Sequence, residues 1–362
     1  MTSVRTITRR LVLAGAATAS LLAALPAQAQ DTAVKFQLDW RFEGPSAFFL
    51  LPQAKGLFKA EKLNVTVDAG NGSGNAVNRV ASGTYDMGFA DLAALMEFHA
   101  NNPTAPNKPV AVMMVYNNTP AAVFSLKKSG IKTPADLTGK KLGAPVFDAG
   151  RRAFPIFQKA NGIGAVNWIS MDPPLRETML AKGDVDAITG FYFTSLLNLE
   201  ARGIKADDVA VQMYPSYGVK LYGNAIIASE EFLKKNPEAV KAFLRAFTKG
   251  AKMVIGDPKA AIAVVKERDG IINADLEERR LKLAIDSSIA GRRLRRHFGA
   301  APVADGQPGG RRLHHQEPHQ PGCHLERQLP AGRRGPGHLL RRQGATEEVT
   351  GRQRPSGTST LS

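Results

Sequence analysis

The feature that most constrains the fold of this 362-residue chain is a short element that occurs twice. It has the pattern Ala-x-Gly-x-x-Asp and spans residues 81–86 and 181–186. Each copy lies between a helical pattern and a short apolar run, and glycine commonly follows the last residue of a helix. The element therefore predicts the same helix-to-strand turn at two places, and hence two related units.

Strands and helices alternate around each copy of this element. The first set has predicted strands at 34–40, 63–67 and 87–90 and predicted helices at 45–55 and 75–82. The second set has strands at 141–144, 167–171 and 187–189 and helices at 150–161 and 175–181. This order predicts an α/β fold with two lobes, each a mostly parallel sheet flanked by helices.

The segments between the two sets predict two crossings between the lobes. An apolar strand at 110–116 leads out of the first set, and a strand at 220–228 leads back. We expect lobe 1 to contain residues 30–117 and 225–291 and lobe 2 residues 118–224, with the two crossover strands as a hinge. Ligands of such sheets bind in the cleft at the carboxyl ends of the strands. Two helices, at 229–234 and 237–255, are expected to follow.

The first 29 residues have the pattern of a signal peptide. Three arginines, Arg5, Arg9 and Arg10, precede an uncharged run at 11–25, and the small-residue triplet at 27–29 fits a cleavage site. The run is shorter than the roughly 20 residues that a membrane-spanning helix needs. The arginine pair also resembles a twin-arginine signal. We expect a periplasmic protein, exported by either the Sec or the twin-arginine route.

Residues 292–362 differ from the rest of the chain in composition. They hold thirteen Arg, no Lys and five acidic residues. Their net charge of +8 is half of the formal net charge of +16 of the whole chain. Such a segment is expected to be disordered. We interpret it as a frameshifted C-terminus, because a one-base shift across residues 323–331 permits the reading AIWNASFLP. The alternatives are a basic arm for nucleic acid or anionic surfaces, and a metal-binding tract at His314, His315 and His319.

The rest of the chain offers little for nucleic-acid binding or catalysis. Residues 31–291 carry 32 Lys and Arg against 27 Asp and Glu, so their charge is nearly balanced. The single Cys of the chain is Cys323, and His99 is the one His between residues 31 and 291. Thiolate nucleophiles, triads and His-rich metal sites are hard to build from this set. We expect no nucleic-acid partner, no metal, no cofactor and no enzymatic activity.

Four motifs follow one another along the chain: Leu38-Asp39-Trp40, Gly56-Leu57-Phe58, Ser73-Gly74 and the repeated element. In this order they resemble the motifs of one family, the NMT1/THI5-like substrate-binding proteins of ABC importers, and the resemblance covers about residues 34–291. It implies the periplasmic-binding-protein fold and a monomeric receptor that passes a small molecule to an ABC permease and its ATPase. The family takes up pyrimidine precursors of thiamine, alkanesulfonates, nitrate and flavins. Its thiamine-precursor branch commonly has Asn and His after Asp-Trp, where this chain has Arg41-Phe42-Glu43-Gly44-Pro45.

Candidate ligand-binding residues lie where predicted strands end and helices begin. Asp39 and Trp40 end the first strand, where Trp can stack on a planar ring and Asp can accept from an amine or amide. A helix N-terminus, which favours anions, is expected at Ser73, Gly74 and Asn75. Further candidates are Thr119 at the first crossing, Phe147, Asp148 and Arg151 at the first helix of lobe 2, and the aromatic residues Phe42, Phe191 and Tyr192.

Two of these positions admit more than one interpretation. Arg151 can clamp an acidic ligand or be solvated, and Asp91 can face the cleft or cap the following helix. Together the candidates predict a small, planar or anionic ligand. Two other functions stay open: an enzyme of the same fold, of the pyrimidine synthase or desulfinase type, and a stand-alone ligand sensor without its own permease.

Overall fold

A computed structural model describes residues 31–289 of the chain. The expected signal peptide at 1–29 and the segment 292–362, with Cys323 and the His tract, lie outside the described residues. The described residues belong to one unit by their backbone contacts.

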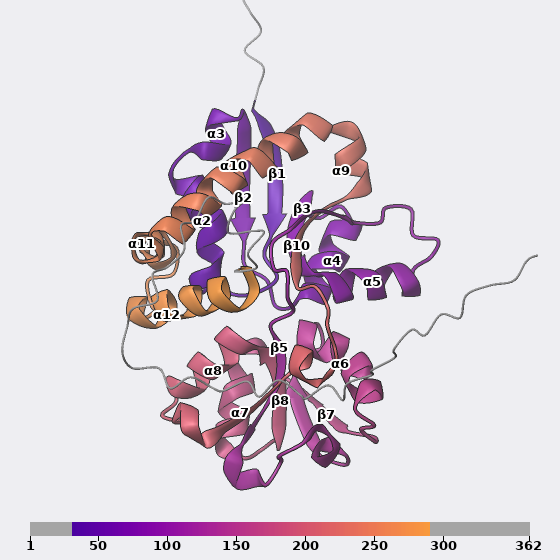
Figure 1. The fold of residues 1–362 in the computed structure, drawn as a ribbon. Helices are drawn as coiled ribbons and strands as arrows, with labels where there is room; N and C mark the ends of the chain where they lie inside the picture. Colours follow the sequence, from indigo (N-terminus) through magenta and orange to yellow (C-terminus); the bar gives the residue numbers. More distant parts are fainter. Residues whose placement is uncertain (1–30, 290–362) are drawn as a thin grey trace, which may run out of the picture. The chain divides into compact units, whose positions relative to one another are not determined.

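Ten strands form two five-stranded sheets within residues 31–289. The first sheet has the order β2-β1-β3-β10-β4, made of β1 (Thr32–Gln37), β2 (Leu63–Asp68), β3 (Met87–Asp91), β4 (Val110–Met114) and β10 (Asn224–Ala228). The second sheet has the order β7-β6-β8-β5-β9, made of β5 (Ala121–Leu126), β6 (Lys141–Ala144), β7 (Asn167–Ser170), β8 (Ala187–Phe191) and β9 (Val209–Met213). We call the parts of the chain around these sheets lobe 1 and lobe 2 (Figure 1).

Helices flank both sheets. Those of lobe 1 are α2 (Ala47–Ala54), α3 (Leu57–Ala60), α4 (Ser73–Ala81), α5 (Leu92–Asn101), α9 (Glu230–Lys235), α10 (Pro237–Gly256), α11 (Pro258–Arg268) and α12 (Ala274–Ala284), with the short turns η1 (Gly44–Ser46) and η7 (Ile285–Ile289). Those of lobe 2 are α6 (Ala149–Ala160), α7 (Arg176–Lys182) and α8 (Tyr192–Glu200), with the turns η2 (Lys127–Ser129), η3 (Pro134–Leu137), η4 (Pro173–Leu175), η5 (Ala206–Asp208) and η6 (Tyr214–Tyr217).

Each sheet contains one antiparallel strand among parallel neighbours. In lobe 1, β1 pairs in parallel with β2 and β3, while β10 runs antiparallel between β3 and β4. In lobe 2, β6 pairs in parallel with β7 and β8, while β5 runs antiparallel between β8 and β9. The antiparallel strand is in both cases the first strand after a crossing from the other lobe. The predicted two-lobed, mostly parallel α/β fold is confirmed.

The repeated Ala-x-Gly-x-x-Asp element ends a helix and ties two strands together. The glycine of each copy has a left-handed φ, +75° in the first and +83° in the second, which glycine adopts at low cost. The closing aspartate accepts a hydrogen bond from the backbone of the sheet's first parallel strand: Asp86 Oδ2 from Lys35 N, and Asp186 Oδ2 from Lys141 N, both at 2.8 Å. The element therefore sets the register of the third strand against that strand.

A cluster of phenylalanines forms the core of lobe 1. The rings of Phe36 and Phe243 stack with centroids 5.0 Å apart, and those of Phe49 and Phe247 lie 5.1 Å apart. These contacts hold α10 across the sheet and against α2 (Figure 1). The apolar face of this helix, formed by Val240, Phe243, Phe247 and Val254, is buried in this cluster, while Leu244 beside it is partly buried.

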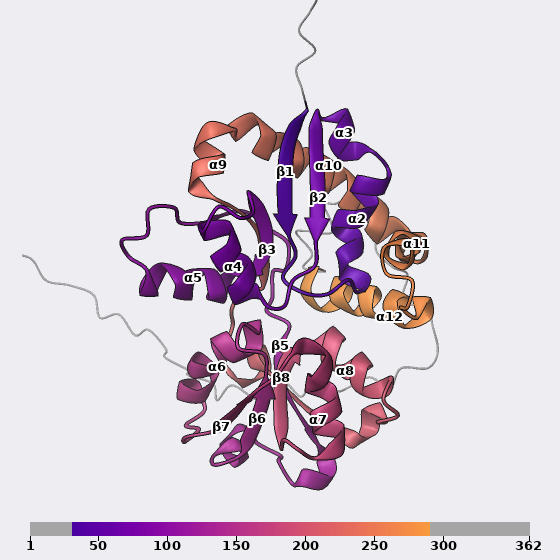
Figure 2. The ribbon, with the colours of Figure 1, turned by 180° about the vertical axis from the view of Figure 1, so that it is seen from behind.

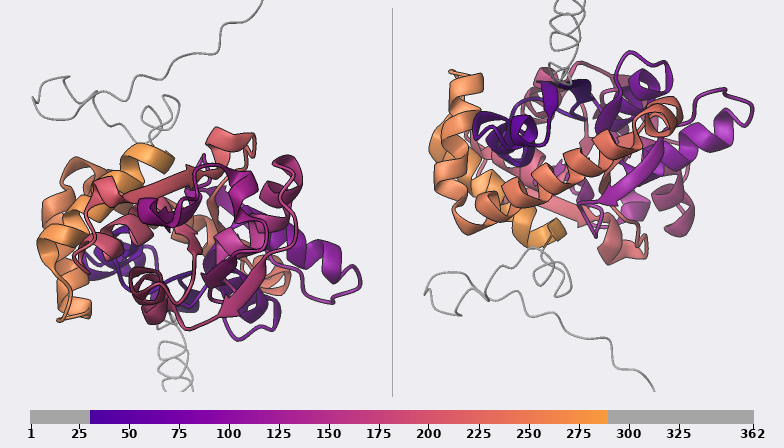
Figure 3. Two further views of the ribbon diagram at one scale, coloured as in Figure 1. Left: turned by 90° about the horizontal axis from the view of Figure 1, so that it is seen from below. Right: turned by 90° about the horizontal axis from the view of Figure 1, so that it is seen from above.

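The remaining helices of lobe 1 lie beside β3 or next to the turn η1. Figure 2 shows α4 and α5 beside β3, and Figure 3 shows α11 and α12, in orange, next to each other. The helices α11 and α12 both contact η1, the turn that follows β1. Within residues 31–289, no helix combines the length and the apolar character needed to cross a membrane.

Candidate functional site

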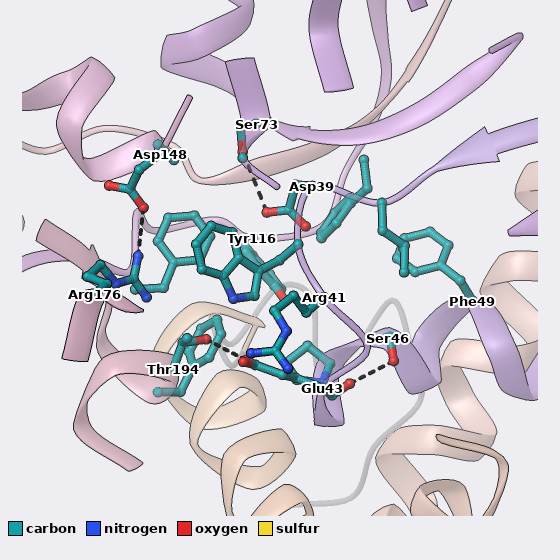
Figure 4. A pocket seen from close by; sticks show the side chains of 18 residues that line it. Asp39, Arg41, Glu43, Ser46, Phe49, Ser73, Tyr116, Asp148, Arg176 and Thr194 are labelled. Atoms are coloured by element: carbon teal, nitrogen blue, oxygen red, sulfur yellow. Dashed lines mark hydrogen bonds and ion pairs between the residues drawn. The ribbon is translucent and has the colours of Figure 1, made fainter. Parts of the chain in front are cut away.

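A pocket that is partly open to solvent is lined by both lobes. Figure 4 shows its labelled side chains arranged around a common space. The lining residues of lobe 1 are Leu38, Asp39, Trp40, Arg41, Glu43, Pro45, Ser46, Phe49, Gly72, Ser73, Phe89 and Tyr116, and those of lobe 2 are Asp148, Ala149, Arg176, Phe191, Phe193 and Thr194. Many follow the carboxyl end of β1 or β8, where open parallel sheets bind their ligands.

Asp39 contributes a carboxyl group that titrates near neutral pH. Asn224 Nδ2 donates to Asp39 Oδ2 at 2.7 Å, and Ser73 Oγ lies 3.5 Å from the same oxygen. Among the described residues no cation forms an ion pair with this carboxylate, and burial raises its pKa from 3.8 to about 7. The group can therefore accept a hydrogen bond from a ligand or, when protonated, donate one.

Trp40 presents a hydrogen-bond donor that the described residues leave without a partner. Its indole Nε1 is buried and has no acceptor among residues 31–289. The guanidinium of Arg176 lies over its ring, 4.7 Å from the centroid. Because buried donors are nearly always paired, an acceptor on a bound ligand is the natural partner for this N–H group.

Arg176 is a buried cation in the wall of lobe 2 that is flanked by two carboxylates, and its Nη2 lies 2.8 Å from Glu177 Oε1 without forming a well-aligned hydrogen bond. It is 1% exposed, and its Nη1 donates to Asp148 Oδ2 at 3.0 Å while its Nε donates to Glu177 Oε1 at 2.9 Å. Thr189 Oγ1 donates to the other oxygen of Asp148 at 2.8 Å. A Cβ at Gly190 would lie 2.3 Å from Ser195 Oγ and 3.0 Å from the Arg176 guanidinium carbon, so glycine fits the strand there without displacing them. With two carboxylates bound, Arg176 positions Trp40 and Asp148 and has little charge left for an anion.

The rest of the lining combines an interlobe hydrogen bond, an exposed cation and a buried phenol. Thr194 Oγ1 of lobe 2 donates to Glu43 Oε2 of lobe 1 at 3.0 Å. Arg41 lines the pocket with an exposed side chain. Burial and the carboxyls of Asp39 and Glu43 raise the pKa of the Tyr116 hydroxyl well above 10, so this hydroxyl stays protonated. These groups can bind and orient a molecule.

Five of the residues predicted from the sequence line this pocket. They are Asp39, Trp40, Ser73, Asp148 and Phe191. Asp148 also begins α6, because its Oδ1 accepts from Arg151 N at 2.9 Å. Its carboxylate therefore caps a helix and holds Arg176 at the same time.

The other eight predicted residues lie outside the pocket lining, several of them for clear structural reasons. Asp91 caps α5 by accepting from Ala93 N at 2.9 Å, and Arg151 lies over Trp168 while donating to Ala144 O and Ser170 Oγ at 3.0 Å. Gly74 N donates to Phe147 O at 3.2 Å, which joins the two lobes. The ring of Phe42 lies under the guanidinium of Arg268, and Tyr192 is the first residue of α8. The remaining two are Asn75, within α4, and Thr119, which is buried at the crossing.

Arg176, Glu43, Tyr116 and Thr194 were missed by the sequence analysis. Arg176 stands beside Glu177 and two residues after Pro174, at a helix start that follows a strand, a pattern equally typical of a solvated arginine. Within residues 31–289, no group of three or more His, Cys, Asp or Glu is placed to hold a metal ion.

The described residues form a two-lobed α/β fold with a pocket lined by both lobes. The sequence model of the family described as NMT1/THI5 like matches residues 45–261, more than half of the chain. The protein therefore belongs to the NMT1/THI5-like family.

Proteins with related sequences and structures carry two kinds of name. The chain is 28% identical over 239 residues to the 4-amino-5-hydroxymethyl-2-methylpyrimidine phosphate synthase of Aspergillus parasiticus, covering 63% of this chain and 68% of that protein. Its fold matches the alkanesulfonate-binding protein SsuA from Xanthomonas axonopodis pv. citri (TM-score 0.55, 15% identity, 76% and 96% of the two chains). It also matches the periplasmic nitrate-binding protein NrtA from Synechocystis PCC 6803 (TM-score 0.53, 11% identity, 68% of each chain).

Proposed function

We propose that this protein is an extracytoplasmic receptor that captures a small planar ligand between its lobes and delivers it to an ABC permease. The observation that carries the proposal is the unpartnered, buried N–H group of Trp40 in a pocket lined by both lobes. A receptor needs polar groups that a ligand can satisfy and walls that enclose it. The fold shared with the alkanesulfonate- and nitrate-binding proteins supports this reading.

The lining indicates which ligand chemistry fits. Phe49, Phe89, Phe191 and Phe193 give the pocket apolar, aromatic walls that favour a flat molecule. One edge of that molecule accepts from Trp40 Nε1, and a donor on it reaches the carboxyl of Asp39. The exposed Arg41 suits an anionic substituent.

The partners and the location follow from this role. An ABC permease with its ATPase would take the ligand from the receptor, and the signal-peptide pattern would place the receptor in the periplasm. We propose a monomer, because the pocket is complete within one chain.

An enzyme of the same fold is the second candidate, favoured by the 28% identity to a pyrimidine phosphate synthase. In residues 31–289, however, the single His is His99, whose Nε2 lies 2.7 Å from Pro109 O, and there is no Cys. The described pocket lining holds carboxyls, arginines, hydroxyls and the Trp40 indole among apolar groups, with no thiol or imidazole, which favours binding over thiolate or imidazole chemistry. A stand-alone sensor would use the same pocket without a permease.

The test is a ligand screen followed by one substitution. Thermal shift with pyrimidines, flavins, sulfonates and aromatic carboxylates identifies a ligand, because binding raises the melting temperature. In Trp40→Phe the ring remains and the donor is lost, so we expect affinity to fall about fivefold to tenfold, from roughly 1 to 1.5 kcal/mol of hydrogen bonding.

The matched control is Trp168→Phe, which changes the other tryptophan of the chain, on β7 away from the pocket. Its affinity should equal that of the unchanged protein. Unaltered affinity in Trp40→Phe would remove the main support for the proposed site. Conversion of the bound molecule, followed by mass spectrometry, would favour the enzyme instead.

A further inference from the structure

A buried arginine of lobe 1 reaches across to lobe 2 behind the pocket. Arg280 on α12 is 1% exposed. Its Nη1 donates to the carbonyl oxygens of Phe193 at 3.0 Å and Thr194 at 2.8 Å, and its Nη2 donates to Asn198 Oδ1 at 2.8 Å. All three acceptors belong to α8, so a single guanidinium joins a helix of one lobe to a helix of the other.

Two carboxylates of lobe 1 hold this guanidinium in place. Glu277 Oε2 accepts from Arg280 Nε at 2.9 Å and from Gly44 N at 2.6 Å. Glu43 Oε2 lies 3.6 Å from Arg280 Nη1 and accepts from Thr194 Oγ1. The network therefore connects α12, the turn η1 and α8.

The network supports the pocket wall from outside. Glu43, Phe193 and Thr194 line the pocket, whereas Arg280 and Glu277 do not. Arg280 therefore contacts three residues that line the pocket without lining it itself. Through them it holds η1 of lobe 1 and α8 of lobe 2 at a fixed distance.

Separation of the lobes would change the state of this arginine. Its partners Glu277 and Glu43 would move with it, but its three acceptors on α8 would be lost, and Glu43 would lose Thr194. Separation would exchange these hydrogen bonds for hydrogen bonds to water, and because a charged donor gains more than a neutral one from well-placed acceptors, the contact favours the arrangement in which the lobes meet. The fraction of molecules in which the lobes meet sets the apparent affinity for a ligand that binds between them.

We propose that Arg280 is a positioning residue for ligand retention, which joins α12 to α8 in the closed arrangement and keeps Glu43 and Thr194 in the pocket wall. This inference rests on the proposed receptor function. The nearby Arg279 provides a contrast, because it pairs with Glu200 of α8 at 2.8 Å between the same two helices but is 57% exposed.

The first test compares Arg280→Lys with Arg279→Lys. Lysine keeps the charge but cannot reach several acceptors with one planar group. For Arg280→Lys we expect the dissociation rate of the ligand from the screen to rise about tenfold or more, with an association rate within about twofold, in stopped-flow fluorescence. Arg279→Lys should leave both rates unchanged, because exposed ion pairs contribute little. Equal rates in Arg280→Lys and the unchanged protein would overturn the proposal.

The second test needs no ligand and so separates this inference from the receptor function. Spin labels at the exposed positions Ser82 and Lys182, with Cys323 replaced by Ser, report the distance between the lobes. Arg280→Lys should shift the population toward longer distances, and Arg279→Lys should not. If Arg280→Lys does not fold, Asn198→Ala removes one acceptor on α8 and should shift the distances in the same direction. Unchanged distances in a folded variant would contradict the inference, whatever the ligand screen finds.

Discussion

Asp39 faces the ligand space with a carboxyl group whose pKa burial raises to about 7, from the ordinary 3.8. A ligand that donates a hydrogen bond or brings a positive charge binds the carboxylate, so its binding lowers this pKa and releases a proton. We predict that its affinity rises as the pH is raised through about 7 and levels off above that. Calorimetry in buffers with different ionisation enthalpies measures both the affinity and the proton release.

Asp91 supplies the control, since burial raises its pKa to about 7 as well. Its carboxyl caps α5, and Asn is an equally good residue at that position. Asp39→Asn should therefore flatten the pH dependence of binding, and Asp91→Asn should keep it. A slope that persists in Asp39→Asn, or disappears in Asp91→Asn, would assign the titration to another group.

For single residues, the sequence predicts which of them lie at the pocket better than it predicts which side chains they pair with. Asp39 and Trp40 were expected in the cleft because they end the first predicted strand, and the structure places them in the pocket lining, just after β1. Arg151 was a candidate clamp with solvation as the alternative, and its guanidinium lies over Trp168. Arg176 lines the pocket together with Arg41, and the partner of Arg176, Asp148, is 28 residues earlier in the chain. Such pairing is tertiary, and no local pattern distinguishes it from a solvated arginine.

The repeated turn element makes a prediction at the scale of one helix and one strand. A Cβ at Gly83 would meet no atom within 4 Å, but φ there is +75°. Gly83→Ala should therefore lower the free energy of unfolding by about 1 kcal/mol through backbone strain alone. Urea unfolding followed by circular dichroism measures this change.

The matched glycine is Gly256, at the end of α10, where a Cβ also meets no atom within 4 Å and the backbone is not left-handed. Gly256→Ala should be neutral or slightly stabilising, because alanine favours helix. Equal effects of the two substitutions would show that the left-handed turn carries no special cost.

The elements around the repeat could be predicted because their patterns are local. The strand β6 and the helix α10 lie where the sequence places them, to within one residue, and β1 ends three residues earlier than predicted. The strands β5 and β9 were missed. All six residues of β5 are buried, since it lies between β8 and β9 and is covered on both faces. A strand of this kind lacks the alternation that reveals a half-buried one.

The approach of the two lobes depends on a glycine at their contact. Gly72 has φ +140°, and a Cβ there would overlap the carbonyl group of Phe147 in lobe 2. We predict that Gly72→Ala forces the lobes apart, raises the radius of gyration in small-angle X-ray scattering and lowers ligand affinity at least tenfold. Gly83→Ala, which strains a turn within lobe 1, should leave the scattering unchanged. A Gly72→Ala protein with unaltered scattering and affinity would refute this steric role.

The strand order also has a consequence for the synthesis of the chain. Polypeptides emerge with the N-terminus first, and the five strands of lobe 2 are complete once residue 213 has appeared. Lobe 1 has by then made β4, but the strand that joins β4 to its sheet, β10, ends at residue 228, and the core helix α10 ends at residue 256. The later lobe can therefore fold first, while the earlier one waits for a strand encoded more than 100 residues after β4. A nascent chain interrupted between these points carries one finished lobe joined to one that cannot close its sheet.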